Sequence, residues 1–160
     1  MGPFILDEAE SRACTLDFID TNVLVYVRDR TDANKQGLAA EWMAALWETR
    51  RGRLSWQVLQ EYYLNMTTKL SQPRDPEAVR EDIVSLGSWH PVGPDGEVLE
   101  LAWKVQDRFG MSWWDALIVA AAIPSGCRWL LTEDLQDGQN IMGLTVVSPF
   151  EHAPGDLLGT

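Results

Sequence analysis

Residues 16–27 read LDFIDTNVLVYV and give the first clear indication of the fold class. The first four of them, Leu16 to Ile19, are a short apolar run of the kind that forms a buried strand. The run ends in three polar residues, Asp20, Thr21 and Asn22. Residues 23–27 are apolar again, and they either prolong the strand or begin a helical turn. The stretch therefore predicts a buried strand with polar side chains just beyond its carboxyl end.

Outward from this stretch, short apolar runs alternate with helical patterns. Further strands are expected at Leu54–Ser55, Trp89–Val92, Trp129–Leu131 and Leu144–Val147. Capping residues and apolar spacing predict helices at about 32–51, 58–70, 76–86, 95–109 and 113–123. This alternation predicts one α/β domain with a mainly parallel sheet over residues 15–152. We expect residues 1–14 to be a poorly ordered extension and residues 153–160 to be a tail.

The composition fits one globular domain. The chain has 160 residues, 46% hydrophobic and 23% charged, and can bury a core without disulfides. Eight tryptophans are unusually many, and most are expected in the core or at a subunit interface. The net charge of -11 argues against a surface that holds nucleic acid by bulk electrostatics. A negative charge of this size is consistent with carboxylates that bind metal, or with a surface that binds a basic partner.

Cysteine and histidine are scarce. Cys14 and Cys127 make neither a disulfide framework nor a metal-ligand spacing such as C-x-x-C, so free thiols in a reducing cytoplasm are expected. His90 and His152 are too few for a histidine-rich zinc site. No apolar run reaches the roughly 18 residues that span a bilayer, and the first residues do not form a secretory signal. The sequence favours a cytoplasmic protein.

Acidic residues stand where a parallel sheet would bring them together. Asp20 and Asp134 follow predicted strands, and Glu61 and Asp115 lie near the starts of helices on the same side. Because open parallel sheets place their sites beyond the carboxyl ends of the strands, we expect these four side chains to share one crevice. Each also has a structural interpretation of its own, as a helix cap, a solvated side chain or part of a polar turn.

Four carboxylates in one crevice predict a metal site. Without a cation they repel, and like charge raises their pKa values. A divalent cation removes this cost, and ligands that are all oxygen select Mg²⁺ or Mn²⁺. The chain offers no rival serine or cysteine nucleophile with an obvious histidine partner. The residues therefore favour hydrolysis of a phosphodiester by metal-activated water, with one or two ions.

Four segments, in order, resemble the PIN domain: FIDTNVLVY at 18–26, LSWQVLQEYY at 54–63, SWWDALIVAAA at 112–122 and LLTEDLQ at 130–136. The similarity runs from about Leu16 to Phe150 and is closest to VapC-type toxins of bacterial toxin–antitoxin pairs. It implies a three-layer α/β/α sandwich around a mainly parallel sheet, and an endoribonuclease that depends on Mg²⁺ or Mn²⁺. The catalytic, metal-binding acids it implies are Asp20, Glu61, Asp115 and Asp134.

The resemblance also implies supporting residues and partners. Thr21 would be the small polar residue after the first acid, Asn22 would brace the loop, and Thr132 would support the site at the end of its strand. Asp137 competes with Asp134 as the fourth acid, or supports the site or a turn. The implied partners are an RNA substrate, a cognate antitoxin and a second copy in a homodimer. A basic antitoxin segment would complement the acidic chain.

Alternatives stay open at this point. The domain could be a non-catalytic PIN-fold module that binds RNA or protein. A phospho-receiver domain is disfavoured because no lysine follows Lys104 and no aspartate follows an apolar third strand. The basic cluster of Arg50, Arg51 and Arg53 either steers RNA or neutralises a helix end. Trp113 and Trp114 beside Asp115 either stack on an unpaired base or pack in the core or a dimer interface.

Overall fold

The computed structural model describes residues 15–158, so the predicted extension 1–14 lies outside the described residues. Within them, five strands form one sheet, with bounds β1 (Leu16–Ile19), β2 (Gly52–Arg53), β3 (Cys127–Leu131), β4 (Asn140–Ile141) and β5 (Leu144–Val147). Seven α-helices flank it: α2 (Thr21–Arg28), α3 (Ala33–Thr49), α4 (Trp56–Leu64), α5 (Pro76–Leu86), α6 (Gly96–Phe109), α7 (Trp113–Ala122) and α8 (Pro154–Leu158). A π-helical turn, η1 (Asn65–Lys69), continues α4, and a 3₁₀ turn, η2 (Gly87–Trp89), follows α5.

The sheet is mainly parallel, as the alternation of strands and helices predicts. Its strand order is β2-β1-β3-β5-β4. β1 pairs in parallel with β2 and β3, β3 pairs in parallel with β5, and the short β4 runs antiparallel to β5. Ile19 at the end of β1 lies beside Leu131 at the end of β3. The residues that follow these two strands therefore emerge next to each other at one edge of the sheet.

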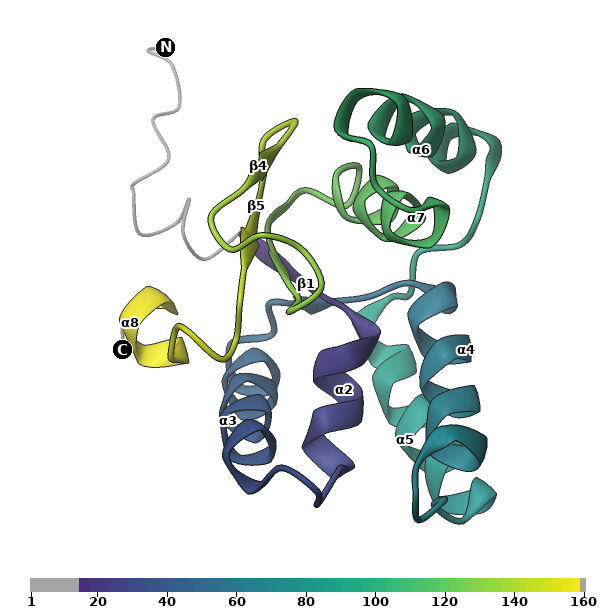
Figure 1. Cartoon of the computed structure of the whole chain (residues 1–160), viewed down its shortest axis with the longest axis vertical. Coiled ribbons are helices and arrows are strands. Elements are labelled where there is room, and N and C mark those ends of the chain that lie inside the picture. The colour runs from purple at the N-terminus through teal and green to yellow at the C-terminus, as the bar shows by residue number, and fades with distance from the viewer. Residues whose placement is uncertain (1–14, 159–160) are drawn as a thin grey trace, which may run out of the picture.

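Helices lie on both sides of the strands, which confirms the predicted α/β fold (Figure 1). In that view, α6 and α7 lie at the top and α2, α3, α4 and α5 at the bottom. Phe18 and Ile19, whose side chains alternate across β1, are both fully buried, as expected for a strand covered on both faces. Residues 21–28 form a helix and do not prolong the strand, because Asp20 caps it by accepting a hydrogen bond from the backbone N–H of Thr21 (2.7 Å).

Three details of the sheet differ from the sequence prediction. The strand expected at Leu54–Ser55 lies two residues earlier, as β2, and Trp89–Val92 is not a strand but a 3₁₀ turn followed by one bridge between Ser55 and Val92. The short β4 was not predicted. Two-residue strands carry too little apolar pattern to be found by periodicity.

Gly52 has a packing role in β2 and does not end α3. Arg50 takes the left-handed conformation at the end of α3, with a φ of 58°. A Cβ on Gly52 would lie 2.4 Å from the ring of Trp89, which is itself buried. The glycine therefore lets a tryptophan ring lie flat against the backbone of the edge strand.

Replacing Gly52 by alanine should destabilise the fold. The added methyl group collides with a ring that has no free space, and overpacking of this kind costs about 1–3 kcal/mol. Gly37→Ala in α3 is the matched control, since nothing lies within 4 Å of its Cβ position. It should raise stability by roughly 0.5–1 kcal/mol, because alanine suits a helix better than glycine. Urea unfolding of both variants checks this, and equal stabilities would contradict the close contact.

A buried ion pair holds the amino end of the sheet. Asp17 in β1 is fully buried, and its Oδ1 lies 3.3 Å from Nε of Arg128 in β3. Two buried atoms of the pair, Oδ2 of Asp17 and Nη2 of Arg128, have no hydrogen-bond partner among the described residues. Burial raises the pKa of Asp17 to about 6, although the positive charges of Arg128 and Arg51 lower it. The buried thiol of Cys127 has its own pKa raised to about 12, by burial and by Asp17.

This ion pair predicts a pH dependence of stability. Because the pKa of Asp17 is higher in the folded state than its usual 3.8, the folded chain holds this proton more tightly. The resulting stabilisation is fully present below about pH 4 and is lost as the pH rises through about 6. Relative to Asp17→Asn, the unfolding free energy of the unaltered chain should fall by on the order of 1–3 kcal/mol over this window. Urea unfolding at pH 4, 5, 6 and 7 measures the difference, and a rise with pH would mean that Arg128 dominates.

The carboxyl-terminal residues are part of the fold. Of the predicted tail, residues 154–158 form α8, which contacts α3. The buried Trp42 of α3 donates its indole N–H to the carbonyl oxygens of His152 (2.9 Å) and Pro149 (3.2 Å). No helix within residues 15–158 is both long and apolar enough to cross a membrane.

Candidate functional site

The four predicted acids line one cleft at the carboxyl edge of the sheet. The cleft has a volume of about 400 Å³. Asp20 follows β1, Asp134 follows β3, Glu61 projects from α4, and Asp115 is the third residue of α7. Four segments that are far apart in the sequence thus contribute one carboxylate each. We call these four residues, Asp20, Glu61, Asp115 and Asp134, the acidic cluster.

Asp20 is the deepest member of the acidic cluster, with 6% of its surface exposed. Its Oδ1 accepts a hydrogen bond from the backbone N–H of Thr21 (2.7 Å), and its Oδ2 accepts one from the hydroxyl of Thr132 (2.9 Å). Burial raises the pKa of Asp20 to about 7, and the negative charges of Asp134 and Glu61 add to the rise. A carboxylate buried in this way is costly to ionise unless a positive charge is near.

Glu61 is held by two neighbours. The hydroxyl of Thr21 donates to its Oε2 (2.6 Å), and the side-chain amide of Gln57, one helical turn earlier, donates to its Oε1 (2.8 Å). Thr21 thus links the start of α2 to α4 across 40 positions of sequence. The predicted supporting role of Thr21 has a definite geometry, since its hydroxyl fixes the orientation of Glu61.

Asn22 and Thr132 connect the first and last members of the acidic cluster. The side-chain amide of Asn22 donates to Oδ2 of Asp134 (2.9 Å) and lies 3.0 Å from the hydroxyl oxygen of Thr132. The same hydroxyl oxygen accepts the backbone N–H of Asp134 (3.1 Å). Thr132 is fully buried between the two strand ends. Its hydroxyl therefore sets the relative position of Asp20 and Asp134.

Asp115 occupies the first turn of α7, where its carboxylate suits the helix dipole. Ser112 caps this helix and accepts the backbone N–H of Asp115 at 3.2 Å. Burial raises the pKa of the half-buried Asp115, and the charges of Asp134 and Glu61 raise it further. The members of the acidic cluster therefore repel one another in the absence of a cation.

Asp137 lies outside this cleft. Its Oδ1 accepts the backbone N–H of Ser148, and its Oδ2 contacts Nε2 of His152, both at 2.8 Å. The hydrogen bond from Ser148 lowers the pKa of Asp137, with a smaller contribution from His152. Asp137 thus joins the turn after β3 to the carboxyl-terminal segment. Of the two candidates for the fourth acid, Asp134 is the one that lines the cleft.

The spacing of the acidic cluster bears on how it would hold metal. Among the described residues, one trio of His, Cys, Asp or Glu side chains has ligand atoms within 4.8 Å of one another, Asp137, Glu151 and His152. Both oxygens of Asp137 in that trio are already hydrogen-bonded. Within the described residues, no three members of the acidic cluster have ligand atoms this close together.

The donor atoms of the cleft fit a hard divalent cation. Among the described residues that line it there is no histidine or cysteine, and the acidic cluster offers carboxylate oxygens of the kind that Mg²⁺ and Mn²⁺ prefer. The buried Oδ1 of Asn22 has no hydrogen-bond partner among residues 15–158. A buried acceptor without a donor is costly, and a cation or its hydration shell relieves this cost.

Sequence reasoning missed several residues of the cleft. Gln57 escaped notice although its position four residues before Glu61 on a helix was a readable signal. Lys69 stands in no motif, yet it lines the cleft and is the sole Lys or Arg among the lining residues of the described chain. Its position depends on the π-helical turn η1, and such turns occur often at functional sites. No sequence pattern predicts a π-turn.

The basic cluster of Arg50, Arg51 and Arg53 lies elsewhere. The carbonyl oxygen of Arg51 accepts the backbone N–H of Asp17, at the amino end of β1 (2.9 Å). Asp20 stands at the carboxyl end of the same strand. The cluster is therefore at the opposite edge of the sheet from the acidic cluster, which favours its structural interpretation over RNA steering.

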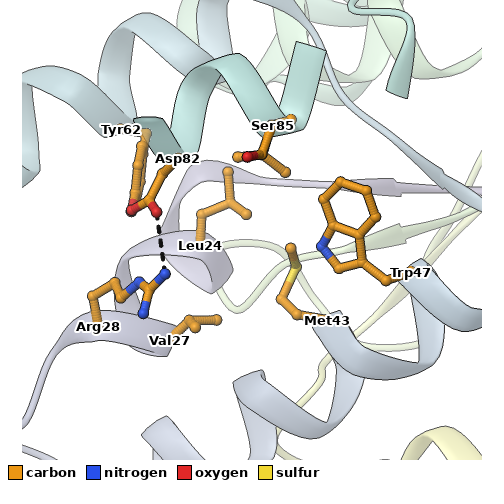
Figure 2. Close-up of a pocket in the computed structure, with 9 residues that line it drawn as sticks. Leu24, Val27, Arg28, Met43, Trp47, Tyr62, Asp82 and Ser85 are labelled. Carbon is orange, nitrogen blue, oxygen red and sulfur yellow. Dashed lines mark hydrogen bonds and ion pairs between the residues drawn. The ribbon is translucent and has the colours of Figure 1, made fainter. Parts of the chain in front are cut away.

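A second cleft, of about 330 Å³, lies among α2, α3, α4 and α5 and differs in character (Figure 2). It is lined mostly by apolar side chains, among them Leu24, Val27, Met43 and Trp47. Its one acid, Asp82, is already bound by the hydroxyl of Tyr62 (2.6 Å) and the guanidinium of Arg28 (3.1 Å). This cleft therefore offers a single carboxylate, whereas the acidic cleft brings the four of the acidic cluster together.

Comparison with known protein families matches residues 18–136 to the PIN domain. The chain belongs to the PIN domain family. The match includes all four members of the acidic cluster and ends before Asp137. This PIN domain matches none of the curated proteins with which it was compared.

Solved structures with a similar fold include VapC toxins. A toxin–antitoxin complex from Klebsiella pneumoniae has a TM-score of 0.58 at 18% identity, covering 83% of this chain and 97% of that one. VapC20 of Mycobacterium tuberculosis, a toxin that cleaves the sarcin–ricin loop, has a TM-score of 0.53 at 19% identity, covering 74% and 91%. A DNA-bound VapBC from Salmonella typhimurium has a TM-score of 0.58 at 16% identity, covering 82% and 96%. At these identities the similarity shows the fold alone.

Proposed function

We propose that this PIN domain is a Mg²⁺- or Mn²⁺-dependent endoribonuclease that acts as the toxin of a toxin–antitoxin pair. The observation that carries the proposal is the acidic cluster, in which four carboxylates from distant segments line one cleft. PIN domains are generally nucleases and typically bind divalent metal ions. The similar folds of VapC toxins support the more specific assignment to a toxin.

In this proposal the acidic cluster holds the metal, and the polar residues around it hold the acidic cluster. The chemistry that a divalent ion would supply there is polarisation of the phosphodiester and a lower pKa of water at the site. Thr21 keeps Glu61 turned into the cleft, and Asn22 does the same for Asp134. Thr132 fixes Asp20. These partners reduce the conformational freedom of the carboxylates, so that less entropy is lost when the metal and RNA bind.

A matched pair of aspartates tests this assignment. Asp134→Asn removes a carboxylate from the cleft, and we expect a loss of RNA cleavage of roughly a hundredfold or more. Asp137→Asn changes a carboxylate only three positions away, outside the cleft, and should keep cleavage within about threefold while lowering stability by about 1 kcal/mol through the weakened contacts to Ser148 and His152.

The measurement is cleavage of a single-stranded RNA by the purified chain in Mg²⁺, in Mn²⁺ and in excess EDTA. Both metals should support cleavage, and EDTA should abolish it. The proposal is wrong if cleavage persists in EDTA, or if Asp134→Asn and Asp137→Asn have the same activity. The same assay separates this proposal from a non-catalytic PIN module, which would bind RNA but leave it intact in every condition.

An antitoxin and a second copy of the chain are the proposed partners. One of the similar structures is a toxin–antitoxin complex, which supports an antitoxin at the level of the family. The net charge of -11 suits a partner segment that is basic. A small reading frame next to this one, whose product copurifies with the chain and inhibits its RNA cleavage, would identify the antitoxin. Light scattering on the purified chain would establish whether it is a homodimer.

A further inference from the structure

A hollow lined by tryptophan adjoins the acidic cleft. It has a volume of about 230 Å³ and lies between the start of α4, the loop at residues 92–94, α6 and α7. Its aromatic lining is Trp56, Trp113 and Trp114, and we call it the tryptophan pocket. Trp114 lines both this pocket and the acidic cleft. The two therefore form one continuous surface, with Trp114 at the boundary.

Two of the three tryptophans of this pocket are exposed. The sequence predicts that most tryptophans lie in the core or at an interface, but within the described fold Trp42 and Trp89 alone are buried. Trp114 is 64% exposed and Trp56 is 45% exposed. Exposing indole rings to water costs free energy, and neighbouring exposed aromatic rings mark a binding surface.

The walls of the tryptophan pocket are fixed before any ligand binds. Val92 donates its backbone N–H to Leu54 and accepts that of Trp56, both at 3.0 Å. A Cβ on Gly93 would lie 3.9 Å from Cδ1 of Trp56, so the loop passes close beside this ring. Backbone hydrogen bonds therefore anchor the loop to the start of α4.

Gln57 joins the tryptophan pocket to the acidic cluster. Its side-chain amide donates to Oε1 of Glu61 (2.8 Å) and to the carbonyl oxygen of Trp114 (3.3 Å). The position of Trp114 at the start of α7 is thereby tied to a carboxylate of the cleft. A ligand group on Trp114 would sit at a fixed offset from the proposed metal site.

We propose that the tryptophan pocket receives an unpaired base of the RNA substrate, the base next to the scissile phosphate, which stacks on Trp114. This inference rests on the proposed function and specifies how that function engages single-stranded RNA. Stacking on an aromatic face is a general way in which proteins bind unpaired bases.

The distribution of charge favours a base over other ligands. Among the described residues that line the tryptophan pocket, none is Asp, Glu, Lys or Arg, so it suits a flat uncharged group and not a phosphate. Gln60 contributes an amide group, and Gln57 an amide oxygen, that can bind a base edge. The acidic cleft has one lining cation, Lys69, and cannot hold RNA by charge alone. Stacking supplies affinity that electrostatics does not.

The test compares RNA oligonucleotides that lack one base at a time around the mapped cleavage site. For the unaltered chain, removal of the base that occupies the tryptophan pocket should lower kcat/KM roughly 5- to 100-fold. Trp114→Ala should lose a similar factor on intact RNA and should not respond to removal of that base. Trp114→Phe should recover part of the loss. Trp103→Ala is the control, since Trp103 is 54% exposed on α6 and lines neither cavity.

A binding assay separates failure of this inference from failure of the proposed function. The Asp20→Asn variant, which should be inactive, and the double variant Asp20→Asn/Trp114→Ala are each titrated with a labelled single-stranded RNA. Two results together support the pocket even if cleavage is never observed: RNA binds more weakly on loss of Trp114, and removal of one particular base weakens binding only when Trp114 is present. If removal of the base lowers kcat/KM by the same factor in the active chain with Trp114 and with Trp114→Ala, the inference about the pocket is wrong and the proposed nuclease function still stands.

Two other outcomes also decide the matter. No binding of RNA by any variant overturns both the pocket and the proposed function. A fall from dimer to monomer in Trp114→Ala, with unchanged sensitivity to the missing base, assigns the tryptophan pocket to contact with a second copy and overturns the inference. Circular dichroism of each variant checks that the helical content of the fold is retained.

Discussion

Asp20→Asn is expected to abolish metal-dependent RNA cleavage while making the metal-free chain more stable. Asp20 is almost fully buried, with Glu61 and Asp134 near it, and its raised pKa shows that the folded chain ionises it at a cost. The amide of asparagine has nearly the same shape and no charge. At pH 8 in EDTA the variant should gain on the order of 1–3 kcal/mol in unfolding free energy.

Metal should reverse the order of stability. A cation that binds only the folded chain stabilises it in proportion to its affinity. Mg²⁺ should therefore raise the melting temperature of the unaltered chain and have little effect on Asp20→Asn. Cleavage should fall by roughly a hundredfold or more in the variant, since a proposed metal ligand and its charge are both lost. Thermal unfolding with Mg²⁺ or EDTA, beside the cleavage assay, measures both effects.

Asp17→Asn is the control for this experiment. It also neutralises a buried aspartate of β1, but at the amino end of the strand, beside Arg128. Cleavage should be unchanged in this variant, and Mg²⁺ should stabilise it as it stabilises the unaltered chain. A strong loss of cleavage in Asp17→Asn would mean that any buried charge change in β1 damages the site, and the argument from Asp20 would fail.

Trp42→Ala is expected to have the largest effect on stability. Trp42 is fully buried in α3, and loss of such a side chain to alanine costs about 3–5 kcal/mol. Its indole N–H also binds the carbonyl oxygens of Pro149 and His152, so the substitution releases the segment that leads to α8. Small domains have only about 5–15 kcal/mol of stability, so this variant should lie close to unfolding.

Trp42→Phe separates packing from hydrogen bonding. Phenylalanine fills most of the space but donates no hydrogen bond, and leaving buried carbonyl groups without a donor costs about 1–3 kcal/mol. Urea unfolding should therefore rank the unaltered chain first, Trp42→Phe second and Trp42→Ala last. Hydrogen exchange in residues 149–158 should speed up in both variants. A loss below about 1 kcal/mol in Trp42→Ala would show that α3 does not depend on this ring.

Much of the fold was predictable because its signals are local. Each strand or helix is indicated by a few neighbouring residues. The apolar run Leu16–Ile19 indicates the first strand, and the capping residues Asp32, Asp95 and Ser112 mark the starts of three helices. Parallel pairing then follows from general rules of connection. Short edge strands were not predictable, since β2 depends on the ring of Trp89 lying over Gly52, 37 residues away in sequence (89 − 52).

The acidic cluster was predictable as a set, but its supporting contacts were not. Topology brings the ends of β1 and β3 together, and so it brings Asp20 and Asp134 together as well. The hydrogen bond from Asn22 to Asp134 joins residues 112 positions apart. The side-chain rotamers that form it cannot be predicted from one sequence. The exclusion of Asp137 depends on its contacts with Ser148 and His152, which require the carboxyl-terminal segment to fold back.

Binding of Mn²⁺ to the acidic cluster tests the central claim most directly. Electron paramagnetic resonance or calorimetry of the purified chain should detect tight, saturable binding, weakened in Asp20→Asn, Glu61→Gln, Asp115→Asn and Asp134→Asn. Asp137→Asn should bind as the unaltered chain does. Equal affinity in all five variants, or none in the unaltered chain, would contradict the claim that these distant carboxylates share a divalent ion.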